Sequence, residues 1–191
     1  MLKITTSWDD GDVLDKKLGD LLMRYGVKGT FYITKNYRPE RLTEGDIKNL
    51  AKFHEVGAHT LTHPDLRAIE TDKLNEEITG SKKWLEEIVG SEIKMFCYPK
   101  GLNNERVIAA TQKAGFLGAR NTIQYSTDLP IEAFQIPTTI QVYPFPFRKV
   151  SRNKYYLKKI IEPYRQRSHG LRSLGVSIFA MRSWLSMAKA A

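Results

Sequence analysis

Short runs of β-branched and aromatic residues alternate with helix-like apolar patterns along the first three quarters of the chain. The runs that predict strands cover residues 2–8, 28–34, 56–59, 93–98, 116–120 and 135–143. Apolar residues at helical spacing predict helices over 13–25, 43–53, 71–88 and 104–114. Strands that alternate with helices indicate βα units around a parallel sheet. The pattern therefore predicts an α/β fold of the barrel type, whose functional residues lie at the carboxyl ends of strands.

Capping signals locate some of the helix ends. Thr43 and Asp46 form a weak capping-box pattern at the start of the second predicted helix. Thr71 is the expected N-cap of the third helix, and Gly90 is its expected C-terminal stop.

The last quarter of the chain has a different composition. After the proline-rich segment 143–147, two basic helical patterns follow at about 154–167 and 171–190. Residues 148–191 contain eleven Lys and Arg residues and one acidic residue, so the net charge of +9 is concentrated there. Such a segment is compatible with binding to nucleic acid or an anionic membrane. Its aromatic residues extend an apolar stripe, however, which favours a core-facing helix, and we expect no nucleic-acid partner.

Composition and length limit the class of protein. A chain of 191 residues suits one core, so we expect a single domain, 1–191, with 148–191 as its basic helical part. Cys97 is the only cysteine, which excludes an intramolecular disulfide and a thiolate cluster, so His, Asp or Glu must hold any metal. No apolar run reaches about 18 residues, and the N-terminus lacks a signal-peptide pattern. We therefore expect a cytoplasmic protein without a transmembrane segment.

Asp9 and Asp10, followed by Gly11, end the first predicted strand. Two carboxylates at a strand terminus can both point into a shared opening, where their like charges favour a cation. The alternative is a plain turn or a helix N-cap, because Asp and Gly are common in turns.

His59 and His63 are spaced i and i+4 in the segment HTLTH. At this spacing two imidazoles lie on one side of a helical turn and can reach one ion, although two unrelated surface histidines are the alternative. With one carboxylate they form a ligand set that favours zinc, with cobalt, nickel, manganese and iron as alternatives. Such a metal would lower the pKa of bound water towards about 7, and the second aspartate could accept its proton.

Three motifs, in this order, resemble those of a known family: SWDDG at 7–11, HTLTH at 59–63 and FCYPKG at 96–101. They resemble the polysaccharide deacetylase family, the NodB-homology group of carbohydrate esterase family 4. The resemblance implies a distorted (β/α) barrel of the seven-stranded type. It also implies roles for seven residues: Asp9 as the general base, Asp10, His59 and His63 as ligands of one divalent metal ion, and Tyr98, Pro99 and Lys100 as the substrate and oxyanion segment.

The reaction implied by the resemblance is hydrolysis of N-acetyl groups from amino sugars of a poly- or oligosaccharide. A tetrahedral oxyanion would be stabilised by the metal and by the backbone N–H of Tyr98 or Lys100, since Pro99 has none. Two alternatives stay open at this point: a deacylase or amidohydrolase acting on a non-sugar amide, and a catalytically impaired domain that binds metal or carbohydrate.

The chain departs from the family pattern at two places. Cys97 stands where the common third motif has an arginine that would orient the base, and we interpret it as a packed strand residue, with a nucleophile as the alternative. The family also has a late strand with a histidine that acts as general acid. His169 lies in a basic segment without strand character and is expected to be a solvated loop residue. Asp128 is a candidate fourth-motif carboxylate or a turn residue.

We therefore expect the barrel to be incomplete at the C-terminus, through truncation or divergence. Loss of a general acid typically costs about 10²–10⁴ in rate, so activity would be weak while metal binding persists. An incomplete barrel would expose an apolar edge, which is compatible with a homodimer.

Overall fold

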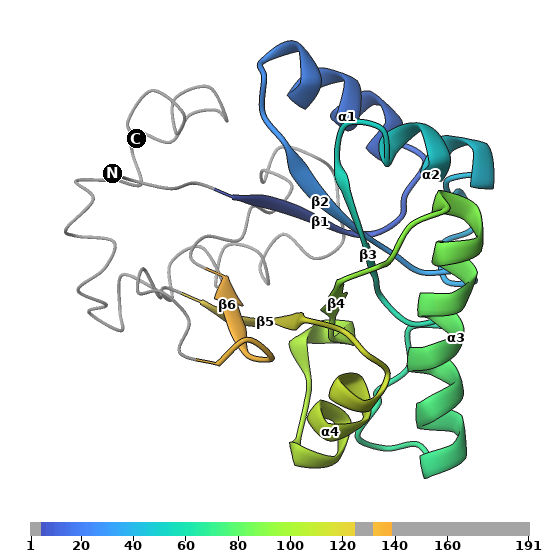
Figure 1. The fold of residues 1–191 in the computed structure, drawn as a ribbon, viewed down its shortest axis with the longest axis vertical. Helices are drawn as coiled ribbons and strands as arrows, with labels where there is room; N and C mark the ends of the chain where they lie inside the picture. The colour runs from blue at the N-terminus through green and yellow to red at the C-terminus, as the bar shows by residue number, and fades with distance from the viewer. Residues whose placement is uncertain (1–4, 125–131, 139–191) are drawn as a thin grey trace, which may run out of the picture. The chain divides into compact units, whose positions relative to one another are not determined.

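The computed structural model describes residues 5–124 and 132–138 (Figure 1). By its internal contacts the chain divides into two compact units, Met1–Thr122 with Pro130–Ile136, and Ile123–Leu129 with Pro137–Ala191. All site residues described below belong to the first unit. The predicted helices at 154–167 and 171–190, and the proposed division at residue 148, lie outside the described residues.

The strands of the described residues form a curled sheet, which makes a half-barrel. The strands are β1 (Thr6–Asp10), β2 (Gly29–Ile33), β3 (Glu55–Ala58), β4 (Met95–Cys97), β5 (Gly118–Gln124) and β6 (Ile136–Thr138). Their order in the sheet is the order of the chain, and each neighbouring pair from β1 to β5 is parallel. The predicted α/β fold of the barrel type is confirmed.

In the described part of the chain, α-helices cover the outer face of the curled sheet (Figure 1). They are α1 (Asp15–Arg24), α2 (Glu44–Leu50), α3 (Thr71–Val89) and α4 (Glu105–Lys113), and a short 3₁₀ turn, η1 (Pro99–Gly101), follows β4. Among the described residues, no helix has the length and apolar character needed to cross a membrane.

The core lies between the helices and one face of the sheet. Alternate residues of the strands meet apolar residues of the helices there, including Phe31, Ile33, Ala58, Phe96 and Ala119 from the sheet and Ile47, Leu74, Ile78, Leu85 and Val107 from the helices. Side chains alternate across a strand, so the intervening residues face the inside of the half-barrel. This leaves the inner face and the carboxyl strand ends for polar residues.

Most element ends follow the predicted signals. Thr43 and Asp46 form a complete capping box at α2, and Gly90 ends α3 in a left-handed conformation with φ 74°. The prediction for Thr71 is wrong: Glu70 is the extended N-cap residue, and Thr71 is already helical. The first strand also runs on to Asp10, two residues beyond its predicted end.

Asp15 is a buried carboxyl in the first turn of α1. Burial, with the negative charges of Asp12, Asp10 and Asp9, raises its pKa from 3.8 to about 7. The folded chain thus holds this proton more tightly than the unfolded chain. Its contribution to stability is fully present below pH 4 and is lost as the pH rises through about 7.

We predict that Asp15→Asn, which keeps the shape of the side chain without its charge, raises the free energy of unfolding at pH 8 by roughly 2–4 kcal/mol. The gain should shrink to near zero at pH 4, where the wild-type carboxyl is protonated. Urea denaturation at both pH values, with a chelator present, measures the difference. Asp20→Asn on the exposed face of the same helix is the control. Equal gains at pH 4 and pH 8 would contradict the prediction.

Candidate metal site and catalytic base

The end of β1 separates the two adjacent carboxylates. Asp10 has φ 80° and Gly11 has φ 70°, so the chain turns through two left-handed residues. A Cβ atom at position 11 would lie 2.7 Å from the Ile33 side chain, so glycine is required there. The Thr34 hydroxyl donates to the Asp10 carbonyl at 2.8 Å and holds the turn. As a result, the two carboxylates point to different partners.

The HTLTH segment forms an irregular loop after β3, so the predicted helical turn is wrong. Thr60 and His63 both have left-handed φ values, 71° and 60°, which a helix does not allow. The Thr60 hydroxyl accepts a hydrogen bond from the His63 backbone N–H at 2.9 Å. The two imidazoles still face one another, with ring centroids 4.9 Å apart. The two histidines therefore lie close together as expected, but an irregular loop and not a helical turn brings them there.

Glu77 of α3 determines the shape of this loop. Its side chain is completely buried, and its carboxylate accepts the backbone N–H groups of Leu61 and Thr62 at 2.8 Å and 2.9 Å. The same carboxylate accepts the Thr62 hydroxyl at 2.6 Å. A loop with left-handed residues cannot satisfy these donors itself, so a helix residue supplies the acceptor. The sequence analysis did not single out Glu77, which looks like an ordinary helix-surface acid.

Asp10, His59 and His63 form a group that could hold a metal ion. One ligand atom from each lies within 4.8 Å of the others. Asp10 Oδ1 is 3.6 Å from Nε2 of each imidazole. His59 Nδ1 lies 2.6 Å from the Cys97 carbonyl oxygen, so Nδ1 carries the hydrogen and the Nε2 lone pair faces Asp10. The donor set therefore fits a divalent cation, as the sequence predicts.

Local charges favour a cation at this position. Burial lowers the pKa of His63 to about 4, with a further decrease from His59. Burial works against ionisation of Asp10, but His59 and Arg38 outweigh it and lower the pKa of the carboxyl. Burial also disfavours charge on His59, whereas Cys97 and Asp10 raise its pKa well above the ordinary value. A positive charge between Asp10 and His59, either a proton or a metal ion, is therefore stabilised.

The segment after β2 supplies two more partners of the ligands. Arg38 places one guanidinium nitrogen 2.5 Å from Asp10 Oδ2, which leaves Oδ1 facing the imidazoles. The Tyr37 ring stacks on His63 with centroids 4.1 Å apart and an interplanar angle of 19°. Outer partners of this kind fix the orientation of metal ligands. Neither residue belongs to a recognised motif, so the sequence analysis missed both.

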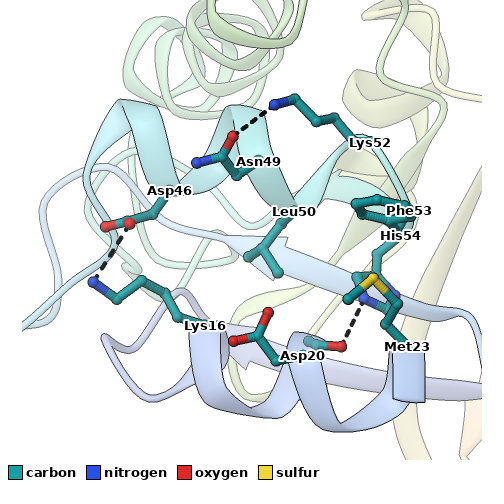
Figure 2. Close-up of a pocket in the computed structure, with 10 residues that line it drawn as sticks. Lys16, Asp20, Met23, Asp46, Asn49, Leu50, Lys52, Phe53 and His54 are labelled. Atoms are coloured by element: carbon teal, nitrogen blue, oxygen red, sulfur yellow. Dashed lines mark hydrogen bonds and ion pairs between the residues drawn. The ribbon is translucent and has the colours of Figure 1, made fainter. Parts of the chain in front are cut away.

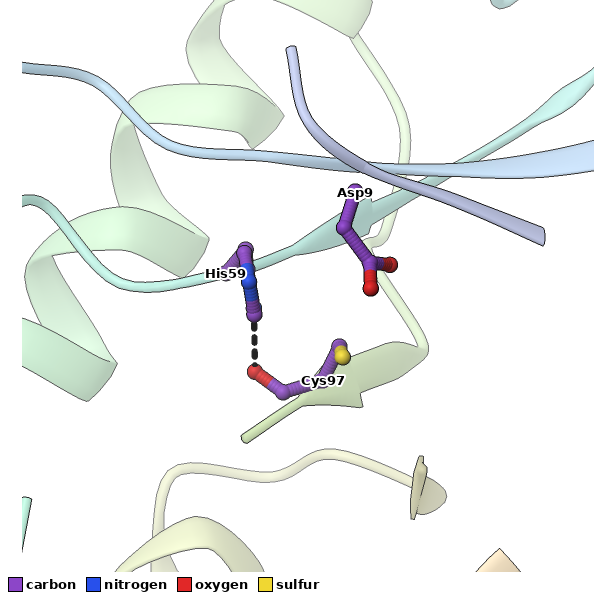
Figure 3. A group of neighbouring side chains, drawn as sticks. All are labelled: Asp9, His59 and Cys97. Carbon is purple, nitrogen blue, oxygen red and sulfur yellow. Dashed lines mark hydrogen bonds between the residues drawn. The ribbon is translucent and has the colours of Figure 1, made fainter. Parts of the chain in front are cut away.

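Asp9 points towards β4 and β5. Together with its neighbours His59 and Cys97, Asp9 forms a second group in which one possible ligand atom from each residue lies within 4.8 Å of the others (Figure 3). This group is a poorer metal site, because an Arg120 guanidinium nitrogen contacts Asp9 Oδ1 and lies 3.1 Å from the Cys97 sulfur. A cation already occupies the position that a metal would need. Asp9 thus lies beside the metal-ligand group and is available for a different role.

Cys97 is a buried residue of β4, which confirms the predicted packed strand residue. Its carbonyl oxygen, and not its sulfur, accepts the hydrogen bond from His59 (Figure 3). This arrangement does not provide the histidine base that a cysteine nucleophile requires.

The third motif turns sharply after β4. The Tyr98 N–H donates to the Arg120 carbonyl at 3.1 Å, and its buried side chain donates to the Phe134 carbonyl at 3.1 Å. Pro99 is buried, and Lys100 has a left-handed φ of 57°. Of the two backbone donors expected for an oxyanion, the Tyr98 N–H is used in strand pairing, so Lys100 is the better candidate. His169 and Asp128 lie outside the described residues.

A separate groove of about 370 Å³ lies between α1 and α2 (Figure 2). It is lined by Lys16, Gly19, Asp20, Met23, Asp46, Asn49, Leu50, Lys52, Phe53 and His54. His54 Nδ1 accepts the Gly29 N–H at 3.3 Å and Nε2 bonds the Gly19 carbonyl at 3.1 Å, so this histidine joins α1 to β2. None of the predicted site residues lines the groove.

Comparison with known proteins gives a consistent result. Residues 3–119 match the family model described as polysaccharide deacetylase. A peptidoglycan-N-acetylglucosamine deacetylase from Bacillus cereus is 30% identical over 115 residues, which cover 59% of this chain and 53% of the relative. A chitooligosaccharide deacetylase from a Bradyrhizobium strain is 28% identical over 120 residues, which cover 57% of this chain and 51% of the relative.

Solved structures agree with these relatives. The crystal structure of a polysaccharide deacetylase from Bacillus cereus matches with a TM-score of 0.62 and 25% identity, over 71% of this chain and 46% of that one. The chain thus spans about half the length of these three proteins. The match over residues 3–119 includes the strand ends that supply both aspartates and both histidines, and this chain therefore belongs to the polysaccharide deacetylase family.

Proposed function

We propose that this protein is a metal-dependent hydrolase that removes N-acetyl groups from amino sugars of a poly- or oligosaccharide. The observation on which the proposal rests is the convergence of Asp10, His59 and His63, with ligand atoms within 4.8 Å of one another, beside Asp9. The names of the relatives, which act on peptidoglycan and chitooligosaccharides, support an N-acetylated carbohydrate as the substrate class.

Asp10, His59 and His63 would hold one divalent ion. A carboxylate and two imidazoles suit zinc best, and cobalt, nickel, manganese or iron are compatible with the same donors. When bound, such an ion acts as a Lewis acid and lowers the pKa of water. Arg38 at Asp10 Oδ2 and the Cys97 carbonyl at His59 Nδ1 keep the inward-facing ligand atoms in place.

Asp9 is the proposed general base. Its side chain is 33% exposed, so water can reach it, and it is not a member of the Asp10, His59 and His63 group. A base must lie within reach of the proton that it accepts and must stay free of the metal. The backbone N–H of Lys100 is the proposed donor to the oxyanion that forms when the acetyl carbonyl is attacked.

The proposal predicts release of acetate from N-acetylglucosamine oligomers or peptidoglycan fragments by purified protein. Chelation should abolish the release and added divalent metal should restore it. Asp9→Asn should keep the bound metal and lower kcat by at least about 10²-fold, because it removes the base and leaves the ligands intact. Acetate assays and metal analysis measure both effects.

Asp72→Asn, which changes an exposed residue of α3, is the matched control and should behave like wild type. Metal bound at one equivalent without acetate release from any acetylated sugar would refute the carbohydrate assignment. Release of a carboxylate from a non-sugar amide would then support the amidohydrolase alternative.

Glu77→Ala should weaken metal binding and destabilise the fold. Two backbone N–H groups of the histidine loop lose their acceptor, which should cost about 2–4 kcal/mol in the free energy of unfolding. Glu77→Gln should be milder, since an amide oxygen still accepts both N–H groups. Urea denaturation of the metal-free protein and metal titration measure the two effects.

The neighbouring exposed residue offers a control, Glu76→Ala, which should leave metal affinity unchanged. If Glu77→Ala and Glu76→Ala bound metal equally well, the role of Glu77 in shaping the ligand loop would be disproved.

A further inference from the structure

Arg120 comes from β5 and reaches across the inside of the half-barrel to β1. One of its guanidinium nitrogens contacts Asp9 Oδ1 and lies 3.1 Å from the Cys97 sulfur. The Arg120 side chain is buried, whereas the Asp9 side chain is one third exposed. Arg120 therefore contacts Asp9 from the buried interior, and the remainder of the Asp9 carboxylate is accessible to solvent.

The sheet register places these residues on the inner face of the half-barrel, at two neighbouring levels. Asp9 pairs with Tyr32, and Tyr32 pairs with Gly57, across β1, β2 and β3. Cys97 pairs with Arg120 across β4 and β5. Paired residues of adjacent parallel strands point to the same face of a sheet. Because Ala58 pairs with Phe96, Arg120 lies two residues nearer the carboxyl ends of the strands than the level of Asp9, and its long side chain spans this offset. Both partners are strand residues, so the contact does not depend on a flexible loop.

Two neighbours shape the space for the guanidinium. The Tyr32 ring lies beneath it, with the guanidinium carbon 5.2 Å from the ring centroid. The ring itself depends on Gly57, because a Cβ atom there would come within 2.5 Å of a Tyr32 ring carbon. Burial opposes the charge on Arg120, but Cys97 and Asp9 raise its pKa, and the guanidinium stays protonated.

Cys97 is the position at which this chain departs from the common third motif. A small side chain at residue 97 leaves the room that the Arg120 guanidinium fills. An arginine at residue 97 would compete with Arg120 for the same carboxylate. The family match ends at residue 119, so it does not assign a role to Arg120.

We infer that Arg120 is the positioning residue for the general base Asp9, and that the small side chain of Cys97 makes room for it; the inference rests on the proposed function. Arg120 binds Oδ1 of Asp9 and so directs the other carboxylate oxygen towards the attacking water. A misplacement of about 1 Å can cost about 10²-fold in rate, so an effect of this size is expected when the guanidinium is lost.

The first test compares Arg120→Met and Arg120→Lys with wild type. Arg120→Met should lower kcat by about 10²-fold, with KM within about twofold and the metal content unchanged. Arg120→Lys keeps the positive charge but lacks the planar guanidinium, so its kcat should lie between those of Arg120→Met and wild type. Added guanidinium should partly restore the kcat of Arg120→Met. Arg24→Met on the exposed face of α1 is the control. Wild-type kcat in Arg120→Met, or loss of its metal, would overturn the inference.

If Arg120→Met does not fold, the kcat and metal content of Arg120→Lys test the inference instead. A folded Arg120→Lys protein with full metal content and a reduced kcat supports the inference, and wild-type kcat overturns it.

A second test does not depend on activity. Melting temperatures of Asp9→Asn, Arg120→Met and the double variant form a double-mutant cycle in metal-free protein. Each single variant removes the contact between Asp9 and Arg120 while one of the two partners remains, so the double variant should lose less than the sum of the two single losses. Additive changes in melting temperature would show that Asp9 and Arg120 are not coupled and would overturn the inference. A coupled cycle in a protein that releases no acetate would refute the proposed function while the pairing of Asp9 with Arg120 stands.

Discussion

Two adjacent carboxylates at the end of one strand create the constraint on which the site depends. Asp9 and Asp10 carry like charges, and each needs a positive partner if both are to stay ionised. The two residues are consecutive on β1, so their side chains leave the strand in different directions. Asp10 faces the two imidazoles and Asp9 faces Arg120. This separation is what the proposed roles require, with one aspartate as a metal ligand and its neighbour as the base.

The site is built from strained backbone that the rest of the domain must support. Within residues 5–124 and 132–138, four residues other than glycine have left-handed φ values: Asp10, Thr60, His63 and Lys100. Each such residue costs on the order of 1–3 kcal/mol, so the surrounding contacts must offset it. For the histidine loop that support is the buried carboxylate of Glu77, and for the first turn it includes the Thr34 hydroxyl. The predicted loss of stability in Glu77→Ala follows from this dependence.

Much of the fold, and the core of the site, could be predicted from the sequence. Alternating strands and helices, the capping box at Thr43 and the group of Asp10, His59 and His63 all carry local signals. The helical turn expected for HTLTH was wrong because the i and i+4 spacing does not distinguish a helix from a loop shaped by a distant acid. Glu77, Tyr37, Arg38 and Arg120 were missed for a related reason: each acts through contacts with residues far away in the chain.

Arg120 offers an explanation of how a motif can change while the proposed chemistry is kept. Residues 97 and 120 are register partners on neighbouring parallel strands, so their side chains leave the sheet on the same face and at the same level. A long, planar side chain at either position can therefore reach the carboxylate at the end of β1. Here residue 120 holds it, with the guanidinium over the Tyr32 ring and 3.1 Å from the Cys97 sulfur. If Arg120 positions the proposed base, as we infer, the small residue at 97 and the arginine at 120 act as a pair, and the pairing of β4 with β5 constrains both positions.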